Sequence, residues 1–104
     1  MKYLLRVDDR AHDEIVTALE AIKSPERSVL FRTRIQDIAD TILEFPDAFP
    51  ILKVTGVTTN LVVRRALILD FPYGLIYSVL PDMQVVRILK CYHTRSNPSD
   101  WFKD

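Results

Sequence analysis

Apolar residues recur along the chain with two different periods, and these periods predict where strands and helices lie. Residues 2–7 alternate between apolar and polar side chains, which is typical of a strand with one buried face. In 9–23, and again between Pro25 and Pro46, apolar residues return every three or four positions, as on one face of an amphipathic helix. Ser24 before Pro25 predicts the second helix start, because serine caps free N–H groups and proline lacks one. The short turn between the helices predicts an antiparallel helix hairpin.

The second half of the chain predicts strands. A breaker segment with two prolines, 45–50, precedes residues 51–60, which fit either a β-rich loop or the start of a strand. Pro81-Asp82 suits the centre of a tight turn. Three runs rich in β-branched and aromatic residues are joined by short connections: 61–69, 73–80 and 83–93. Short connections between successive strands predict a three-stranded antiparallel meander.

These elements predict an α+β fold in the order β-α-α-β-β-β, with a helix hairpin packed on one face of a small, mostly antiparallel sheet. The 104 residues suit a single domain spanning 1–104. A hydrophobic content of 48% excludes a disordered chain. Cys91 is the only cysteine, which favours a reducing, cytoplasmic location, and the N-terminus lacks the apolar stretch of a secretory signal. No apolar run is long enough to predict a membrane span.

Charge is balanced overall but not along the chain. The formal net charge is zero, which argues against a protein that coats nucleic acid through charge alone. Residues 1–50 hold seven Lys or Arg and ten Asp or Glu, whereas residues 51–104 hold seven and four. The C-terminal half is therefore cationic by three charges, and we expect an acidic partner to favour it.

Cationic residues interrupt the apolar strands. Because side chains alternate along a strand, Arg64 and Arg65 are expected to point to opposite faces, as are Arg87 and Lys90. The face turned away from the helices, here called the open face, would then collect arginine beside tyrosine, a combination that binds phosphates and stacks on bases. The alternative without a binding function is that the arginines are solvated or paired with acids, such as Asp70 or Asp82. The predicted binding residues are Arg64, Arg87, Lys90, Tyr73, Tyr77 and Tyr92.

The segment after the last strand carries a second group of candidates. Histidine is the side chain best suited to proton transfer near neutral pH, so His93 is a candidate acid or base. Metal-free RNA cleavage also needs cations for the phosphate, which Arg95 and an arginine of the 64/65 pair would supply if they converge. The predicted catalytic set is therefore His93, Arg95 and Arg65, and it applies only if the chain is a nuclease. The alternative is that His93 bonds to backbone where the sheet ends. Trp101 is expected to dock and anchor the tail.

Other chemistries find no support in the sequence. His12 is the only other histidine, so no metal-ligand cluster is predicted, and no cofactor is expected. Gly56 and Gly74 are isolated, which excludes a glycine-rich phosphate loop. Cys91 lies in a predicted strand without a hydrolase signature, so we expect a small core residue.

Residues 62–101, VVRRALILDFPYGLIYSVLPDMQVVRILKCYHTRSNPSDW, resemble the C-terminal half of the RelE/ParE toxin superfamily of type II toxin–antitoxin modules. The matching features are an Arg-Arg pair in one strand, Phe-Pro-Tyr before the next, and a strand that ends in His-x-Arg followed by Asn-Pro and Trp. The helix end LEFPDAFP, residues 43–50, is also similar to that family, whose order of elements is the one predicted here.

The resemblance implies a small cytoplasmic toxin that inhibits growth, stabilises plasmids and is neutralised in a hetero-oligomer by a cognate antitoxin. RelE-like members cleave mRNA on the ribosome, whereas ParE-like members poison DNA gyrase. By resemblance, the RelE-type arginines fall on Arg64 or Arg65 and on Arg95. A histidine falls on His93, and Tyr92 is the aromatic acid or stacking group.

Departures from the family pattern favour the ParE-like branch. Ser96 stands where a second arginine often follows, and the lysines typical of RelE-like nucleases are reduced to Lys53. The leading hypothesis is therefore a ParE-like toxin that binds its target and is not an enzyme. The alternatives are a RelE-like endoribonuclease, and an inactive homologue or partner-binding domain.

Overall fold

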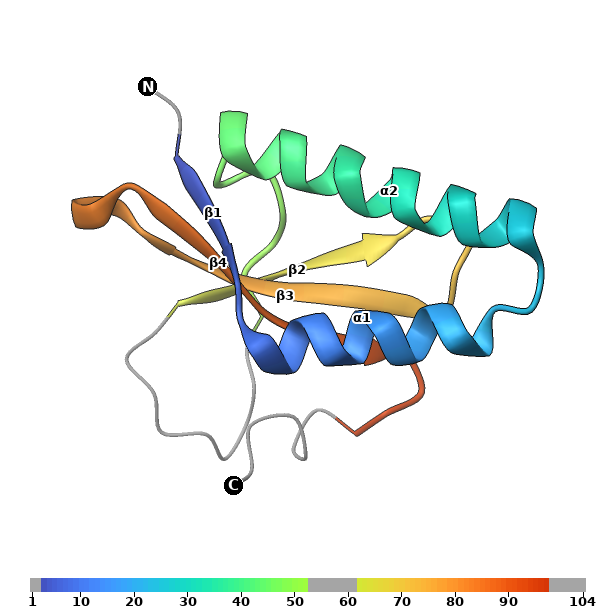
Figure 1. Cartoon of the computed structure of the whole chain (residues 1–104). Coiled ribbons are helices and arrows are strands. Elements are labelled where there is room, and N and C mark those ends of the chain that lie inside the picture. Colours follow the sequence, from blue (N-terminus) through green and yellow to red (C-terminus); the bar gives the residue numbers. More distant parts are fainter. Residues whose placement is uncertain (1–2, 53–61, 98–104) are drawn as a thin grey trace.

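The computed structural model describes residues 3–52 and 62–97. Figure 1 shows two helices lying along a twisted four-stranded sheet. The elements are β1 (Leu4–Val7), α1 (Asp9–Ala21), α2 (Pro25–Glu44), β2 (Val63–Ile68), β3 (Tyr73–Leu80), the single 3₁₀ turn η1 (Pro81–Met83) and β4 (Val85–His93). The α+β class and the order β-α-α-β-β-β are confirmed.

The sheet has the order β1-β4-β3-β2. β2, β3 and β4 form the predicted antiparallel meander, while β1 pairs in parallel with β4. A parallel neighbour needs a crossover connection, and the helix hairpin supplies it. β4 therefore lies inside the sheet, between β1 and β3.

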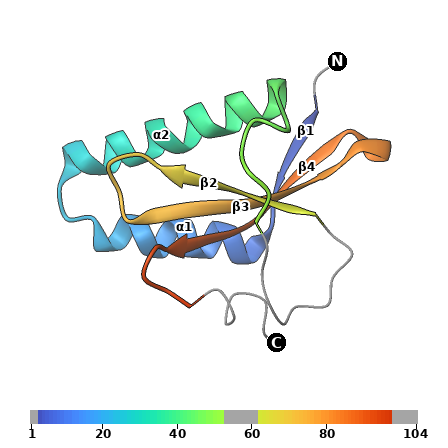
Figure 2. The ribbon, with the colours of Figure 1, turned by 180° about the vertical axis from the view of Figure 1, so that it is seen from behind.

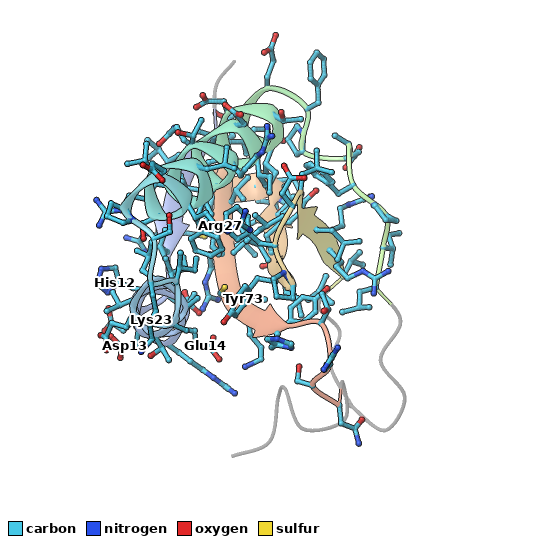
Figure 3. All side chains as sticks on the ribbon, turned by 90° about the vertical axis from the view of Figure 1, so that its right-hand side faces the viewer. His12, Asp13, Glu14, Lys23, Arg27 and Tyr73 are labelled. Carbon is cyan, nitrogen blue, oxygen red and sulfur yellow. The ribbon has the colours of Figure 1, made fainter. Side chains whose placement is uncertain are left out.

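Both helices cover the same face of the sheet, as the end-on view in Figure 3 makes clear. Their apolar stripes pack on alternate residues of β2, β3 and β4 in one cluster around Phe31. Phe31 is fully buried and meets the rings of Phe71 and Tyr73 edge-on, with centroids 4.9 and 5.7 Å away. Cys91 is buried in the same cluster, as predicted.

The N-terminal ends of the two helices are capped differently. The Ser24 hydroxyl accepts a hydrogen bond from the Arg27 N–H, and Pro25 opens α2. Asp8 occupies the N-cap position of α1, but its side chain makes no capping bond there. Its carboxylate is instead engaged by Arg87.

The turn between β2 and β3 is fastened to α2. Asp70 adopts a left-handed backbone with φ of 72°, and Phe71 and Pro72 follow it into β3. Arg34 pairs with the Asp70 carboxylate at 3.0 Å, and Arg27 donates to the Asp70 carbonyl at 3.0 Å. Arg27 also lies over the Phe71 ring, 4.6 Å from its centroid. Asp70 therefore serves the helix rather than the strand arginines with which the sequence suggested it would pair.

Figure 2 views the sheet from behind, where its open face lies. A smaller apolar cluster forms on this face around Val63, Ile76 and Tyr92. Ile51 forms an isolated bridge with Arg64, whereas the rest of the ambiguous segment 51–60, beyond Leu52, lies outside the described residues. Trp101 lies outside them too. Within residues 3–52 and 62–97, neither helix has both the length and the apolar character that a membrane span requires.

Candidate functional site

Arg64 lies on the helix-facing side of the sheet and holds the segment after α2. Its guanidinium donates to the Phe49 carbonyl at 2.8 Å and lies 3.4 Å from the Asp47 carboxylate. Beside it, the Tyr77 hydroxyl donates to the Pro46 carbonyl at 2.7 Å. These two contacts connect β2 and β3 to the double-proline segment, so Arg64 has a structural partner that the sequence did not suggest.

Removing the Tyr77 hydroxyl is expected to lower the free energy of unfolding by about 1 kcal/mol, because the half-buried Pro46 carbonyl loses its donor. Tyr77→Phe keeps the ring, which is fully buried and meets Phe49 edge-on. Urea denaturation of the variant and the parent chain measures the difference. Tyr3→Phe is a control, and an equal loss in both variants would contradict this assignment.

The tyrosines of β3 do not lie on the open face. Tyr73 and Tyr77 both belong to the helix-facing cluster, and this corrects the prediction that one of them would stand beside an arginine on the other side. Tyr77 is fully buried, so it has no surface for a partner.

Arg87 and Lys90 are both engaged in ion pairs. Arg87 donates to both carboxylate oxygens of Asp8, at 2.8 and 3.2 Å. The Lys90 ammonium is buried against the Glu14 carboxylate of α1, which also accepts the Cys91 N–H at 3.2 Å. Glu14 is labelled in Figure 3 on the side of α1 that is next to β4. The cations of β4 are therefore neutralised within the chain.

A register shift changes how the β4 cations are placed. Tyr77 pairs with Ile88 but Ile76 pairs with Lys90, so Leu89 is an extra residue in β4. Arg87 lies opposite Ser78 and Lys90 opposite Ile76, positions two apart on β3. The expectation that Arg87 and Lys90 point to opposite faces assumed unbroken alternation, and it does not hold.

On the open face, Arg65 and Tyr92 meet across Gly74. Tyr92 is directly opposite Gly74 in the register, and its ring occupies the space above that glycine. Burial raises the pKa of the Tyr92 hydroxyl, while the charge of the Arg65 guanidinium and a side-chain hydrogen bond to it act in the lowering direction. An isolated glycine in a strand signals such a close approach, although the sequence does not say which side chain makes it.

His93 and Arg95 lie together in the turn after β4. The Arg95 N–H donates to Nδ1 of His93 at 3.1 Å, which leaves the ring proton of neutral His93 on Nε2. The His93 ring meets Tyr73 edge-on at 5.2 Å, and the Ser96 hydroxyl donates to the His93 carbonyl at 2.6 Å. His93 is thus bonded to backbone at the sheet end, as in the alternative weighed from the sequence.

The predicted catalytic residues do not form one group at the level of the backbone. His93 pairs with Tyr73, whereas Arg65 pairs with Ile76, three residues further along β3. At the usual dimensions of a sheet, the His93 and Arg65 backbones lie about 10 Å apart along the strands and about 10 Å apart across them. The structure brings the His93 ring to the Arg95 N–H, whereas Arg65 pairs at a different position along β3.

Two further features limit the available chemistry. Burial raises the pKa of the Cys91 thiol to about 12, and the Glu14 charge acts in the same direction, so the thiol is not a nucleophile at neutral pH. Among the residues that the structure describes, no three metal-ligating side chains lie together.

Comparison with known proteins identifies the fold. No protein-family model matches the sequence, and no curated protein matches it. Among solved structures, the archaeal RelE–RelB complex from Pyrococcus horikoshii OT3 matches with a TM-score of 0.60 and 25% identity, over 93% of this chain and 100% of that chain. The chromosomal ParDE TA system from P. aeruginosa matches with a TM-score of 0.64 and 12% identity, over 88% and 96%.

A third match is the intact E. coli RelBE toxin–antitoxin complex, with a TM-score of 0.58 and 20% identity over 90% of this chain and 99% of that chain. All three matches extend over nearly the whole chain. They cover the helix hairpin as well as the meander that carried the sequence resemblance. In its fold, this chain is similar to the toxins of the RelE/ParE superfamily.

Proposed function

We propose that this chain is the toxin of a type II toxin–antitoxin module, that it inhibits DNA gyrase by binding in the manner of the ParE-like branch, and that a cognate antitoxin neutralises it. The matched structures support the toxin role, since their names are RelE–RelB, ParDE and RelBE toxin–antitoxin systems. All three matches cover 96% or more of the matched chain, so the likeness is not confined to a fragment.

The observation that carries binding over catalysis is the internal pairing of the cations. Arg64, Arg87 and Lys90 each face an acidic side chain of this chain. A metal-free nuclease needs cations free to stabilise the phosphate next to a base and an acid. Three cations of the sheet are engaged within the chain, and His93 and Arg65 pair with residues three positions apart on β3. Together these observations favour a protein that binds its target over one that cuts RNA.

A RelE-like endoribonuclease is the second candidate, and one observation favours it. Identity is 25% to the archaeal RelE–RelB chain and 20% to the E. coli RelBE chain, against 12% to the ParDE chain. His93 and Arg95 would supply its proton transfer and charge at the end of β4, with Arg65 reaching in only after a rearrangement. An inactive homologue that binds a partner is the third.

Controlled expression in a bacterial host separates these candidates. We expect growth to stop and a DNA-damage reporter to rise while translation continues, and we expect the purified chain to inhibit supercoiling by DNA gyrase. A nuclease would instead produce mRNA cleavage on ribosomes, abolished by His93→Ala or Arg95→Ala. Arg32→Ala, which removes an exposed cation from α2, is the matched control.

Each outcome of that experiment decides something. Early mRNA cleavage without DNA damage would replace the gyrase proposal with the nuclease. Unchanged growth would leave only the partner-binding homologue. Co-expression of a neighbouring gene for a short protein should restore growth, and the segment of it that covers the cationic half should be acidic. A neutral or basic segment would contradict the charge argument.

A further inference from the structure

A cavity of about 580 Å³ lies where the connection between the two helices meets the turn between β2 and β3. Small-molecule sites have volumes of roughly 300–1,000 Å³, so this cavity is large enough for such a ligand. Tyr73 lines it and belongs to the helix-facing cluster, so the cavity is separate from the open face of the sheet. Figure 3 faces this end of the molecule and labels three of the lining residues, Lys23, Arg27 and Tyr73.

The charge of its lining distinguishes this cavity from its neighbours. Lys23 and Arg27 line it, and no acidic side chain is among its described lining residues. The cavities beside Arg34, Arg64 and Arg87 each have at least one aspartate in the lining. Within residues 3–52 and 62–97, neither Lys23 nor Arg27 forms an ion pair. The cavity therefore holds two positive charges that no described acid cancels.

Arg27 is held in the cavity wall by two groups that carry no charge. Its Nη2 donates to the Asp70 carbonyl at 3.0 Å, and its guanidinium lies 4.6 Å from the centroid of the Phe71 ring. The Asp70 carboxylate is engaged by Arg34 instead. A guanidinium has five N–H donors, and the bond to the Asp70 carbonyl uses one of them. Arg27 is thus oriented while most of its donors and its charge stay free for an anion.

The rest of the lining indicates what accompanies the anion. Apart from Ser24, the other lining residues are apolar or aromatic: Ala21, Ile22, Phe71, Pro72 and Tyr73. Nucleic-acid bases stack on aromatic side chains. A phosphate monoester carries roughly −1.5 to −2 charges at neutral pH, which matches two cations better than the single charge of a carboxylate does. A ligand that joins a phosphate monoester to a planar ring therefore fits both parts of the lining.

We propose that this cavity binds a nucleoside monophosphate, whose phosphate pairs with Lys23 and Arg27 and whose base packs on Phe71 and Tyr73. Arginine binds phosphate oxygens through parallel N–H donors, and lysine adds a compact charge. The Ser24 Oγ accepts the Arg27 N–H, so the hydroxyl proton can be donated to the phosphate. The site goes beyond the proposed function, because inhibition of a target and neutralisation by an antitoxin require no nucleotide.

A titration of the whole chain with adenosine monophosphate tests the site. The readout is the Nε–H signal of Arg27 in a ¹⁵N-labelled sample. The comparison ligands are adenosine, which lacks the phosphate, and inorganic phosphate, which lacks the base. We expect saturable shifts with adenosine monophosphate, and affinity at least tenfold weaker with either comparison ligand.

The variants separate binding from folding and from net charge. Lys23→Gln removes one cation of the cavity, and we expect it to weaken binding of adenosine monophosphate at least fivefold. Arg27→Lys keeps the charge but loses the planar group over Phe71, and we expect at least a threefold loss. Arg32→Gln, which removes an exposed cation of α2 outside the cavity lining, should bind as the parent does.

Four results would overturn the proposal. They are equal affinity for inorganic phosphate, equal affinity for adenosine, parental affinity in Lys23→Gln, and an equal loss in Arg32→Gln. If Arg27→Lys is destabilised, Lys23→Gln still decides the question, because the exposed Lys23 forms no ion pair in the described residues that its removal would break. A chain that arrests growth but does not bind the nucleotide refutes this site alone. A chain that binds the nucleotide but leaves growth unchanged refutes only the toxin role.

Discussion

Replacing Phe31 with alanine is expected to lower the free energy of unfolding by about 4 kcal/mol. The ring is fully buried and joins α2 to the rings of Phe71 and Tyr73. Truncation loses that apolar contact and leaves a cavity that the rigid sheet cannot fill. Domains of this size are stable by roughly 5–15 kcal/mol in total, so the variant should lie close to its unfolding transition. Urea denaturation followed by circular dichroism measures the change.

Val29→Ala is the matched control for Phe31. Val29 lies on the same helix but is 64% exposed, so its truncation should change stability by less than about 0.5 kcal/mol. A loss below about 1 kcal/mol in Phe31→Ala would mean that the core around α2 is loosely packed. Because Tyr73 also supports the His93 ring, we expect the signals of His93 to shift in Phe31→Ala and not in Val29→Ala.

The helices and the meander were predictable because their signals are local. The stripe through Phe31 fixes which face of α2 is buried, and Ser24-Pro25 fixes where the helix begins. The prediction placed a strand at 83–93 and the structure has one at 85–93, because Pro81–Met83 forms a 3₁₀ turn rather than a tight turn at Pro81-Asp82. The short connections between β2, β3 and β4 predict antiparallel pairing.

The pairing of the cations was not predictable, because it depends on contacts between distant segments. The sequence suggested Asp70 and Asp82 for their nearness along the chain. Asp47 and Asp8 are the residues that pair with Arg64 and Arg87, and in each case the packing of the helix hairpin on the sheet creates the contact. The parallel pairing of β1 with β4 has the same origin, since no local pattern names a strand's neighbour.

In the candidate site too, local patterns were predictable and irregular ones were not. Alternation correctly separates Arg64 from Arg65, because their partners in the register lie on opposite faces. It fails between Arg87 and Lys90, where Leu89 interrupts the register. A bulge has no reliable sequence signal of its own, so the number of residues between two cations does not settle which face each occupies.

Removing the carboxylate of Glu14 is expected to cost about 3 kcal/mol of folding stability, because it leaves the buried Lys90 ammonium without a counter-charge. The Lys90 side chain is 9% exposed, and the Cys91 N–H would lose its acceptor as well. Glu14→Ala measured by urea denaturation tests this. Glu20→Ala, an exposed acid on the same helix, should change stability by less than about 0.5 kcal/mol.

Removing Lys90 should cost less folding stability than removing Glu14. Glu14 is more exposed than Lys90, so in Lys90→Met the carboxylate can be solvated, and we expect a smaller loss of about 1 kcal/mol. Adding Lys90→Met to Glu14→Ala should recover most of the stability, since a buried charge is exchanged for an apolar side chain. If the double variant is no more stable than Glu14→Ala, the buried Lys90 charge is not the cause of the stability loss in Glu14→Ala.

Lys90→Met also tests the predicted binding role of this lysine. A folded variant that still arrests growth would show that Lys90 acts only through Glu14, and a folded but inactive one would restore it to the binding surface.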